Sequence, residues 1–287
     1  MSDAVDAVLV RIDEGVADVR INRPDKRNAV DGEVMSGLLD AIEQIAGDPR
    51  VRVVVLSGEG KGFCAGLDMA SFGDMVSGDL TADGAASAYD DISAAGANRA
   101  QQLGWGWQEL DIPVIAAVHG GAMGGGLNIA LGADIRIVAP DAKLGFVEVT
   151  FGLLPDMSAT QSLRHIARLD RIKELIFTGR KFTGEQAYEY GIATMLSDTP
   201  REDALAMART IAKRNPDAIR AAKKLLNNAV RGTTREGLIA ESDCSRALMG
   251  TANQLEAIMS GFEGREPRFT DPTLPESNLN KEADLSQ

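Results

Sequence analysis

The hydrophobic positions along this chain follow two periods, one typical of strands and one typical of helices. Residues 8–12 and 16–21 are rich in valine and isoleucine, as strands are, and the polar segment Asp13-Glu14-Gly15 between them predicts a hairpin. Residues 34–46 have apolar side chains every three or four positions, which predicts a helix. Residues 51–56 form a nearly continuous β-branched run, as expected for a strand buried on both faces.

The same alternation continues into the second half of the chain. Strands are predicted over residues 113–118, 134–139 and 143–149, and a helix is predicted to start at the glycines between the first two. Such alternation favours an α/β core with mainly parallel strands. From about residue 157 the pattern becomes helical. We therefore expect a core over residues 1–200, a helical region over 201–270 and a disordered polar tail over 271–287. The long connection over residues 69–111 is expected to cover the site.

Composition narrows the function classes. The chain has 287 residues, a net charge of −12 and two cysteines. The acidic balance argues against a nucleic-acid partner, and two cysteines cannot build a disulfide framework. The first residues lack the basic and apolar regions of a signal peptide, and no run is long enough to insert into a membrane. These features predict a cytoplasmic protein.

The main candidate for chemistry is the glycine run Gly124-Gly125-Gly126, which we expect to carry a strand directly into a helix. Glycines allow a ligand to approach the backbone, and unpaired N–H groups at a helix start can hold a developing oxyanion. The alternative is that these glycines only allow close packing between helix and strand.

A second glycine-containing loop follows the strand at 51–56. Gly60, Gly62 and Ala65 satisfy the loose G-x-G-x-x-A dinucleotide spacing, but this motif should open the first βαβ unit of a chain, and here it does not. A tight surface turn is the other alternative. If the strands before the two glycine loops are parallel neighbours, both loops lie at one sheet edge, and one N–H from each could bind the same oxygen atom.

Two acids provide candidates for proton transfer. Glu148 stands alone among apolar residues, which should raise its carboxyl pKa, although an ion pair with an arginine is the alternative. Asp156 lies just before an expected helix, where it could simply be an N-cap. His119 and His165 have no ligand partners at metal spacing, and His119 has no serine motif to form a triad. We expect no metal.

Several ordered segments together resemble the crotonase (enoyl-CoA hydratase/isomerase) superfamily. The similarity spans about residues 8 to 270. It rests on residues 21–30 (INRPDKRNAV), 63–68 (FCAGLD), 124–126 (GGG), 182–191 (FTGEQAYEYG) and 262–269 (FEGREPRF).

This resemblance implies a spiral of ββα units with a C-terminal helical trimerisation region, as a homotrimer or a dimer of trimers. It implies a coenzyme A thioester substrate and no separate cofactor. The backbone N–H groups of Leu67 and Gly125 would form the oxyanion hole. The residues expected to contact CoA are Lys26, Arg27, Ala65, Gly66 and Asp68.

Departures from the family pattern bear on the reaction. Hydratases of the superfamily carry glutamates at the positions of Asn128 and Glu148, and the amide of Asn128 cannot transfer a proton. The spacing of Glu148 and Asp156 is similar to the acid pair of Δ3,5-Δ2,4-dienoyl-CoA isomerases. The sequence therefore favours a (di)enoyl-CoA double-bond isomerase. The alternatives are a 2-enoyl-CoA hydratase that uses Glu148 while Asn128 orients water, another crotonase reaction, or a degenerate acyl-CoA-binding scaffold.

Overall fold

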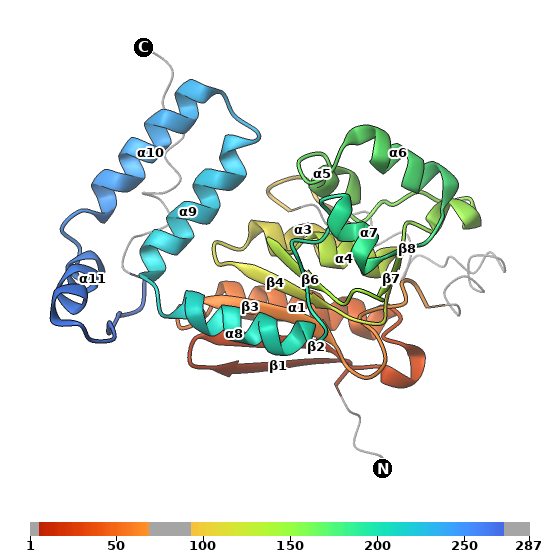
Figure 1. The fold of residues 1–287 in the computed structure, drawn as a ribbon, viewed down its shortest axis with the longest axis horizontal. Coiled ribbons are helices and arrows are strands. Elements are labelled where there is room, and N and C mark those ends of the chain that lie inside the picture. Colours follow the sequence, from red (N-terminus) through yellow and green to blue (C-terminus); the bar gives the residue numbers. More distant parts are fainter. Residues whose placement is uncertain (1–5, 69–92, 273–287) are drawn as a thin grey trace.

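A computed structural model describes residues 6–68 and 93–272 of the chain (Figure 1). Its centre is a six-stranded sheet with the strand order β1-β2-β3-β4-β6-β9. β1 and β2 are antiparallel, and the other neighbouring strands are parallel. The strands span Val8–Asp13 (β1), Val16–Ile21 (β2), Val53–Gly58 (β3), Val114–Val118 (β4), Ile135–Val138 (β6) and Met195–Leu196 (β9).

The predicted hairpin between β1 and β2 is confirmed. Its two central residues, Glu14 and Gly15, have φ angles of 47° and 81°. Two successive positive φ angles define a type I′ turn, whose twist matches that of the flanking strands. The sequence therefore predicts the position of this loop, but Asp13 pairs with Val16 at the end of β1, so the loop has two residues instead of the three predicted.

The prediction that β3 is buried on both faces is also confirmed. Val54 and Leu56 belong to one apolar core, and Val53 and Val55 belong to a second core on the opposite face. α1 (Gly32–Ala46) and α3 (Arg99–Glu109) pack on the first face, and α8 (Pro200–Ala212) packs on the second. α1 begins where Asp31 accepts a hydrogen bond from the Val34 N–H at 3.0 Å, which caps the helix.

A second, smaller sheet corrects two predictions. β5 (Gly121–Met123), β7 (Lys143–Gly145) and β8 (Phe182–Thr183) form it, with β7 in the middle. β5 therefore lies between β4 and the next helix, α4 (Gly125–Leu131). The glycine run does lead directly from a strand into a helix, as predicted, but that strand is β5 and not the strand predicted over 113–118. The strand predicted over 143–149 ends at Gly145, because the chain then closes into the short helix η3 (Glu148–Phe151).

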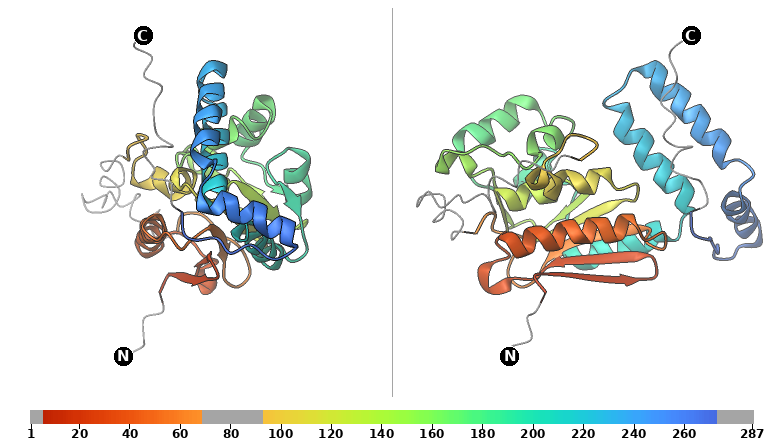
Figure 2. Two further views of the ribbon diagram at one scale, coloured as in Figure 1. Left: turned by 90° about the vertical axis from the view of Figure 1, so that its left-hand side faces the viewer. Right: turned by 180° about the vertical axis from the view of Figure 1, so that it is seen from behind.

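The helical second half of the chain is confirmed in outline. α8 lies inside the range predicted for the C-terminal helical region, but its alanines pack on the sheet. The helices that extend away from the sheet are the three after α8 (Figure 2). Further helices span Pro24–Lys26 (η1), Ala159–Leu163 (α5), Leu169–Thr178 (α6), Gly184–Glu189 (α7), Pro216–Ala229 (α9), Thr234–Leu248 (α10) and Ala252–Glu263 (α11).

Some predictions concern residues outside the described ranges. These include most of the polar tail over 271–287 and residues 69–92 of the long connection. Within residues 6–68 and 93–272, no helix has the length and apolar character needed to cross a bilayer.

Candidate active site

The two glycine-containing loops meet at one edge of the central sheet, as predicted from the parallel pairing of β3 and β4. The Cys64 N–H donates to the Gly121 carbonyl at 3.0 Å, and the Met123 N–H donates to the Cys64 carbonyl at 3.1 Å. An ideal Cβ built on Gly66 would lie 3.6 Å from the Gly125 nitrogen. The peptide between Gly66 and Leu67 therefore lies beside the start of α4.

We call the place where residues 60–67 meet residues 124–126 the glycine junction. The N–H groups of Leu67 and Gly125 both lie at this junction. Within the described residues, neither N–H donates a hydrogen bond to a backbone carbonyl. Gly124, just before α4, has a φ of +49°, a conformation that side chains rarely adopt. Among the described residues the junction thus has two backbone donors without a carbonyl partner in adjacent loops, which is the arrangement expected of an oxyanion hole.

The three glycines of the run have different roles. An ideal Cβ on Gly126 would lie 2.4 Å from the Cys64 carbonyl oxygen, so the close-packing interpretation holds for this glycine. At Gly124 the nearest atom to such a Cβ is Glu148 Oε1, at 3.5 Å. At Gly125 it is the sulfur of Met157, at 2.9 Å. Gly124 and Gly125 therefore face the side chains of Glu148 and Met157.

Glu148 lies next to these glycines at the start of η3. The Asn128 amide donates to Glu148 Oε1 at 2.9 Å and to the Gly124 carbonyl at 2.8 Å. Burial raises the pKa of Glu148, the Asn128 hydrogen bond opposes that rise, and the charge of Asp156 adds to it. The predicted direction of the pKa shift is confirmed. The alternative of an ion pair is wrong, because none of the described arginines pairs with Glu148.

Two buried oxygen atoms of this pair have no hydrogen-bond donor. Asn128 Oδ1 and Glu148 Oε2 are both inaccessible and unpartnered within the part of the chain that the structure describes. Both N–H groups of Asn128 are already used, so its amide offers only an acceptor. Buried acceptors normally have donors, and such exceptions occur where a water molecule or a substrate binds.

Asp156 is exposed and lies three residues before α5. The helix starts at Ala159, and Ser158 occupies the N-cap position, so the interpretation of Asp156 as an N-cap is wrong. Asp156 is near enough to Glu148 for its charge to raise the pKa of that carboxyl. Met157, the next residue, was not predicted as a site residue. An apolar residue before a helix carries no sequence signal that distinguishes it from a core residue.

The residues expected to contact CoA form a partly connected group. Lys26 and Arg27 are exposed on and after η1, and the Arg27 carbonyl accepts a hydrogen bond from the Ala65 N–H at 3.0 Å. The carboxylate of Asp68 lies 3.0 Å from the guanidinium of Arg23 and so has a structural partner. Arg27, Ala65 and the backbone up to Asp68 thus lie together beside the glycine junction.

The dinucleotide spacing and the two histidines were the other candidate features of the sequence. After β3 the segment from Gly60 to Leu67 forms β-bridges to Ala122 and Val30 instead of opening a helix, so the dinucleotide interpretation is wrong. His119 Nε2 lies 3.0 Å from the Gly60 carbonyl oxygen, and His165 is exposed beside Arg164. The described residues contain no group of three or more His, Cys, Asp or Glu placed to hold a metal ion.

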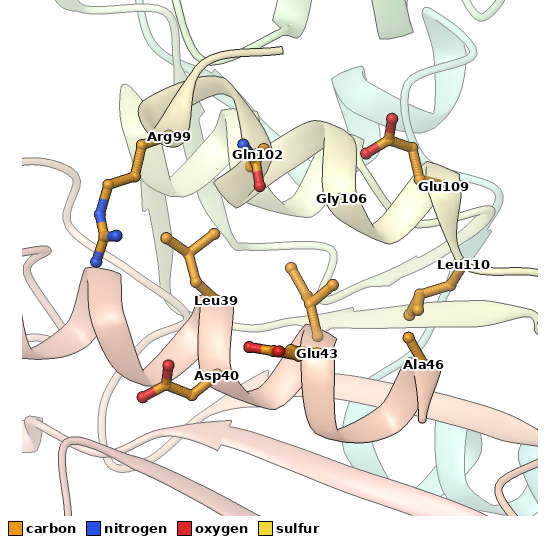
Figure 3. A pocket seen from close by; sticks show the side chains of 10 residues that line it. Leu39, Asp40, Glu43, Ala46, Arg99, Gln102, Gly106, Glu109 and Leu110 are labelled. Atoms are coloured by element: carbon orange, nitrogen blue, oxygen red, sulfur yellow. The ribbon is translucent and has the colours of Figure 1, made fainter. Parts of the chain in front are cut away.

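A separate groove lies between α1 and α3 (Figure 3). It has a volume of about 450 Å³ and is lined by Leu39, Glu43, Gln102 and Leu110 among others. It contains none of the predicted site residues. The glycine junction therefore remains the candidate active site.

Comparisons with known proteins agree with this fold. The sequence model of the family described as enoyl-CoA hydratase/isomerase matches residues 11–272. A protein named "Probable enoyl-CoA hydratase echA8" from Mycobacterium bovis is 31% identical over 269 residues, covering 92% of this chain and 98% of the relative. The mitochondrial enoyl-CoA hydratase domain-containing protein 2 of Mus musculus is 33% identical, covering 89% of this chain and 84% of the relative.

Solved structures give the same result. The crystal structure of an enoyl-CoA hydratase from Bacillus anthracis superposes with a TM-score of 0.81 at 28% identity, covering 93% of this chain and all of that one. An enoyl-CoA hydratase from Mycobacterium tuberculosis superposes with a TM-score of 0.79 at 27% identity, again covering 93% of this chain.

The fold and the glycine junction thus define an α/β enzyme of the crotonase superfamily, which confirms the predicted fold class. The chain belongs to the enoyl-CoA hydratase/isomerase family. The prediction of an acyl-CoA enzyme is confirmed at this level.

Proposed function

We propose that this enzyme adds water to the double bond of a 2-enoyl-CoA thioester, with Glu148 as the single acid–base group. The observation that carries this proposal is the pair of buried acceptors without donors, Asn128 Oδ1 and Glu148 Oε2. A water molecule bound there could donate one hydrogen bond to each, which would leave a lone pair for attack on the substrate. This inference reverses the order of preference that the sequence suggested.

In the proposed reaction the thioester oxygen accepts hydrogen bonds from the N–H groups of Leu67 and Gly125. As the water oxygen attacks C3, Glu148 takes its proton and negative charge develops on the thioester oxygen. Glu148 then returns a proton to C2, which completes the addition. A single oxyanion-hole donor is worth about 2.7–4 kcal/mol in other enzymes. Because the addition of water is redox-neutral overall, the proposal needs no redox cofactor.

The remaining part of the substrate is CoA, and basic residues and a stretch of backbone lie beside the glycine junction, where CoA would bind. We propose that Lys26 and Arg27 contact the CoA phosphates. The adenine end would lie along the backbone of Ala65, Gly66 and Asp68, because the Ala65 N–H is tied to Arg27 and the segment leads into the proposed oxyanion hole. The carboxylate of Asp68 itself is engaged with Arg23.

Isomerisation of a dienoyl-CoA is the second candidate. The observation in its favour is that the charge of Asp156 acts on Glu148. In that reaction one carboxylate would remove a proton from C2 and the other would protonate the distant end of the dienolate. Asp156 would then be essential, whereas hydration by Glu148 alone does not require it.

One set of assays separates the candidates. The wild-type protein and the variants Glu148→Gln and Asp156→Asn are each incubated with crotonyl-CoA and with a 3,5-dienoyl-CoA, and the conjugated-thioester absorbance is followed. We expect hydration by the wild type and by Asp156→Asn, and its loss in Glu148→Gln by at least about 100-fold. Diene isomerisation that is lost in Asp156→Asn would support the second candidate. Binding of acyl-CoA without either reaction would indicate a scaffold.

A further inference from the structure

Met157 lies directly against the proposed oxyanion hole. Its sulfur is 2.9 Å, and its terminal methyl carbon 3.6 Å, from the point where a Cβ on Gly125 would lie. The thioether therefore fills the space that a side chain at position 125 would occupy. Since that Cβ position and the Gly125 N–H belong to the same residue, the sulfur is a close neighbour of the proposed donor.

The backbone of Met157 is fixed by its surroundings. Its carbonyl oxygen and the Ser158 Oγ both lie 2.6 Å from the position of an ideal Cβ on Gly104 of α3, a contact that only glycine at 104 permits. Ser158 has a φ of +72°, which sets the turn before α5. The side chain of Met157 is half-buried and packs against the main core. The segment is thus wedged between α3 and the start of α4.

We propose that Met157 determines specificity by limiting the size of the substituent at C2 of the acyl chain. This inference rests on the proposed function, in which the thioester oxygen binds at Gly125 and Glu148 exchanges a proton with C2. Glu148 Oε1 is the nearest atom to a Cβ on Gly124, and Met157 Sδ is the nearest atom to a Cβ on Gly125. C2 must therefore lie within reach of both side chains, and a methyl group on C2 would compete with the thioether for space.

The expected change in substrate preference can be judged from other apolar pockets that bind a substrate. One methylene group more or less in such a pocket changes kcat/KM by about 10- to 200-fold. Truncation of Met157 to alanine removes the sulfur and its methyl group, whereas leucine approximately conserves the volume. Met157→Leu is therefore a matched control for Met157→Ala.

The test compares kcat/KM for crotonyl-CoA and its 2-methyl analogue, tiglyl-CoA, in the wild type, Met157→Ala and Met157→Leu. We expect the wild type to prefer crotonyl-CoA and Met157→Ala to raise the tiglyl-to-crotonyl ratio by about tenfold or more. Met157→Leu should leave that ratio close to the wild-type value. An unchanged ratio in Met157→Ala, with crotonyl-CoA still hydrated, would overturn the proposal.

A binding measurement separates this proposal from the proposed reaction. If the wild type hydrates neither substrate, it does not hydrate short 2-enoyl-CoA thioesters, and calorimetric binding of butyryl-CoA and 2-methylbutyryl-CoA to the same three proteins tests Met157 by itself. If Met157→Ala binds 2-methylbutyryl-CoA nearly as well as butyryl-CoA while the wild type prefers butyryl-CoA, the role of Met157 is supported. The same ratio of affinities for the two thioesters in all three proteins contradicts that role. A thermal melt of each variant shows whether it is folded.

Discussion

The hydrogen bond from Asn128 to Glu148 joins two residues that lie twenty positions apart in the sequence. Asn128 is fully buried, and its amide uses both N–H groups to hold Glu148 and the Gly124 carbonyl. A neutral donor to a carboxylate stabilises the ionised form, so Asn128 opposes the effect of burial on the pKa of Glu148. This makes Asn128 a positioning residue in addition to a proposed water ligand.

The pH dependence of activity should reveal this hydrogen bond. Glu148 must be ionised to accept a proton, so kcat/KM falls as the pH drops through its pKa, which burial raises above the ordinary value of 4.5. In Asn128→Ala the hydrogen bond that lowers this pKa is lost, and the acidic limb of the profile should move to higher pH. Asn227→Ala, a change on α9, is the control. A limb that stays in place or moves to lower pH would contradict the assignment.

At the scale of elements, one buried lysine connects α9 to several segments of the core. The ammonium group of Lys223 donates to the carbonyls of Trp107 and Ile112 at 3.0 and 2.9 Å, and it lies 2.9 Å from the Asp134 carboxylate. Burial lowers the pKa of Lys223, and the charge of Asp134 opposes that shift. The lysine therefore links α9 to the end of α3 and to the segments that precede β4 and β6.

Replacement of Lys223 by methionine should destabilise the protein by about 3 kcal/mol, because two carbonyls and a carboxylate would lose their buried donor. Urea denaturation measures this change in the free energy of unfolding. Lys213→Met is the matched control, since Lys213 pairs with Glu266 at the exposed surface, and it should change stability by no more than about 0.5 kcal/mol. Equal stabilities of the two variants would show that the Lys223 cluster contributes little.

At the scale of the whole molecule, the C-terminal helices carry exposed apolar side chains that residues 6–68 and 93–272 leave uncovered. α9, α10 and α11 lie away from the sheet (Figures 1 and 2). Leu226 on α9 is 70% exposed and Phe262 on α11 is 84% exposed. A set of exposed apolar side chains on adjacent helices is typical of a protein–protein interface. This supports the expected homotrimer or dimer of trimers, which stays a prediction.

Light scattering after size-exclusion chromatography should give a mass that is a multiple of three protomers for the wild type. The double variant Leu226→Glu, Phe262→Glu should shift that mass toward the monomer, because buried unpaired carboxylates would oppose assembly. Leu169→Glu places the same charge on α6, where the leucine is 61% exposed, and should leave the assembly intact. A monomeric wild type would contradict the expected assembly.

The sequence by itself determined the longer elements of the core and the class of the protein. Its two hydrophobic periods predict the hairpin, the buried strand β3, α1 and the helical second half, because each pattern depends on residues close together in the chain. The five ordered segments that resemble the crotonase superfamily predict the family. The loop junction was predictable as well, since parallel neighbouring strands bring their carboxyl ends to one edge.

The tertiary structure decided what each site residue contacts. β5 and η3 were missed because a three-residue strand and a single helical turn leave too few positions to show a period. The unpartnered oxygens of Asn128 and Glu148, and the thioether of Met157 beside Gly125, depend on the packing of α3, α4, η3 and the turn before α5. Contacts between segments so distant in the chain are set by packing, which no local pattern encodes.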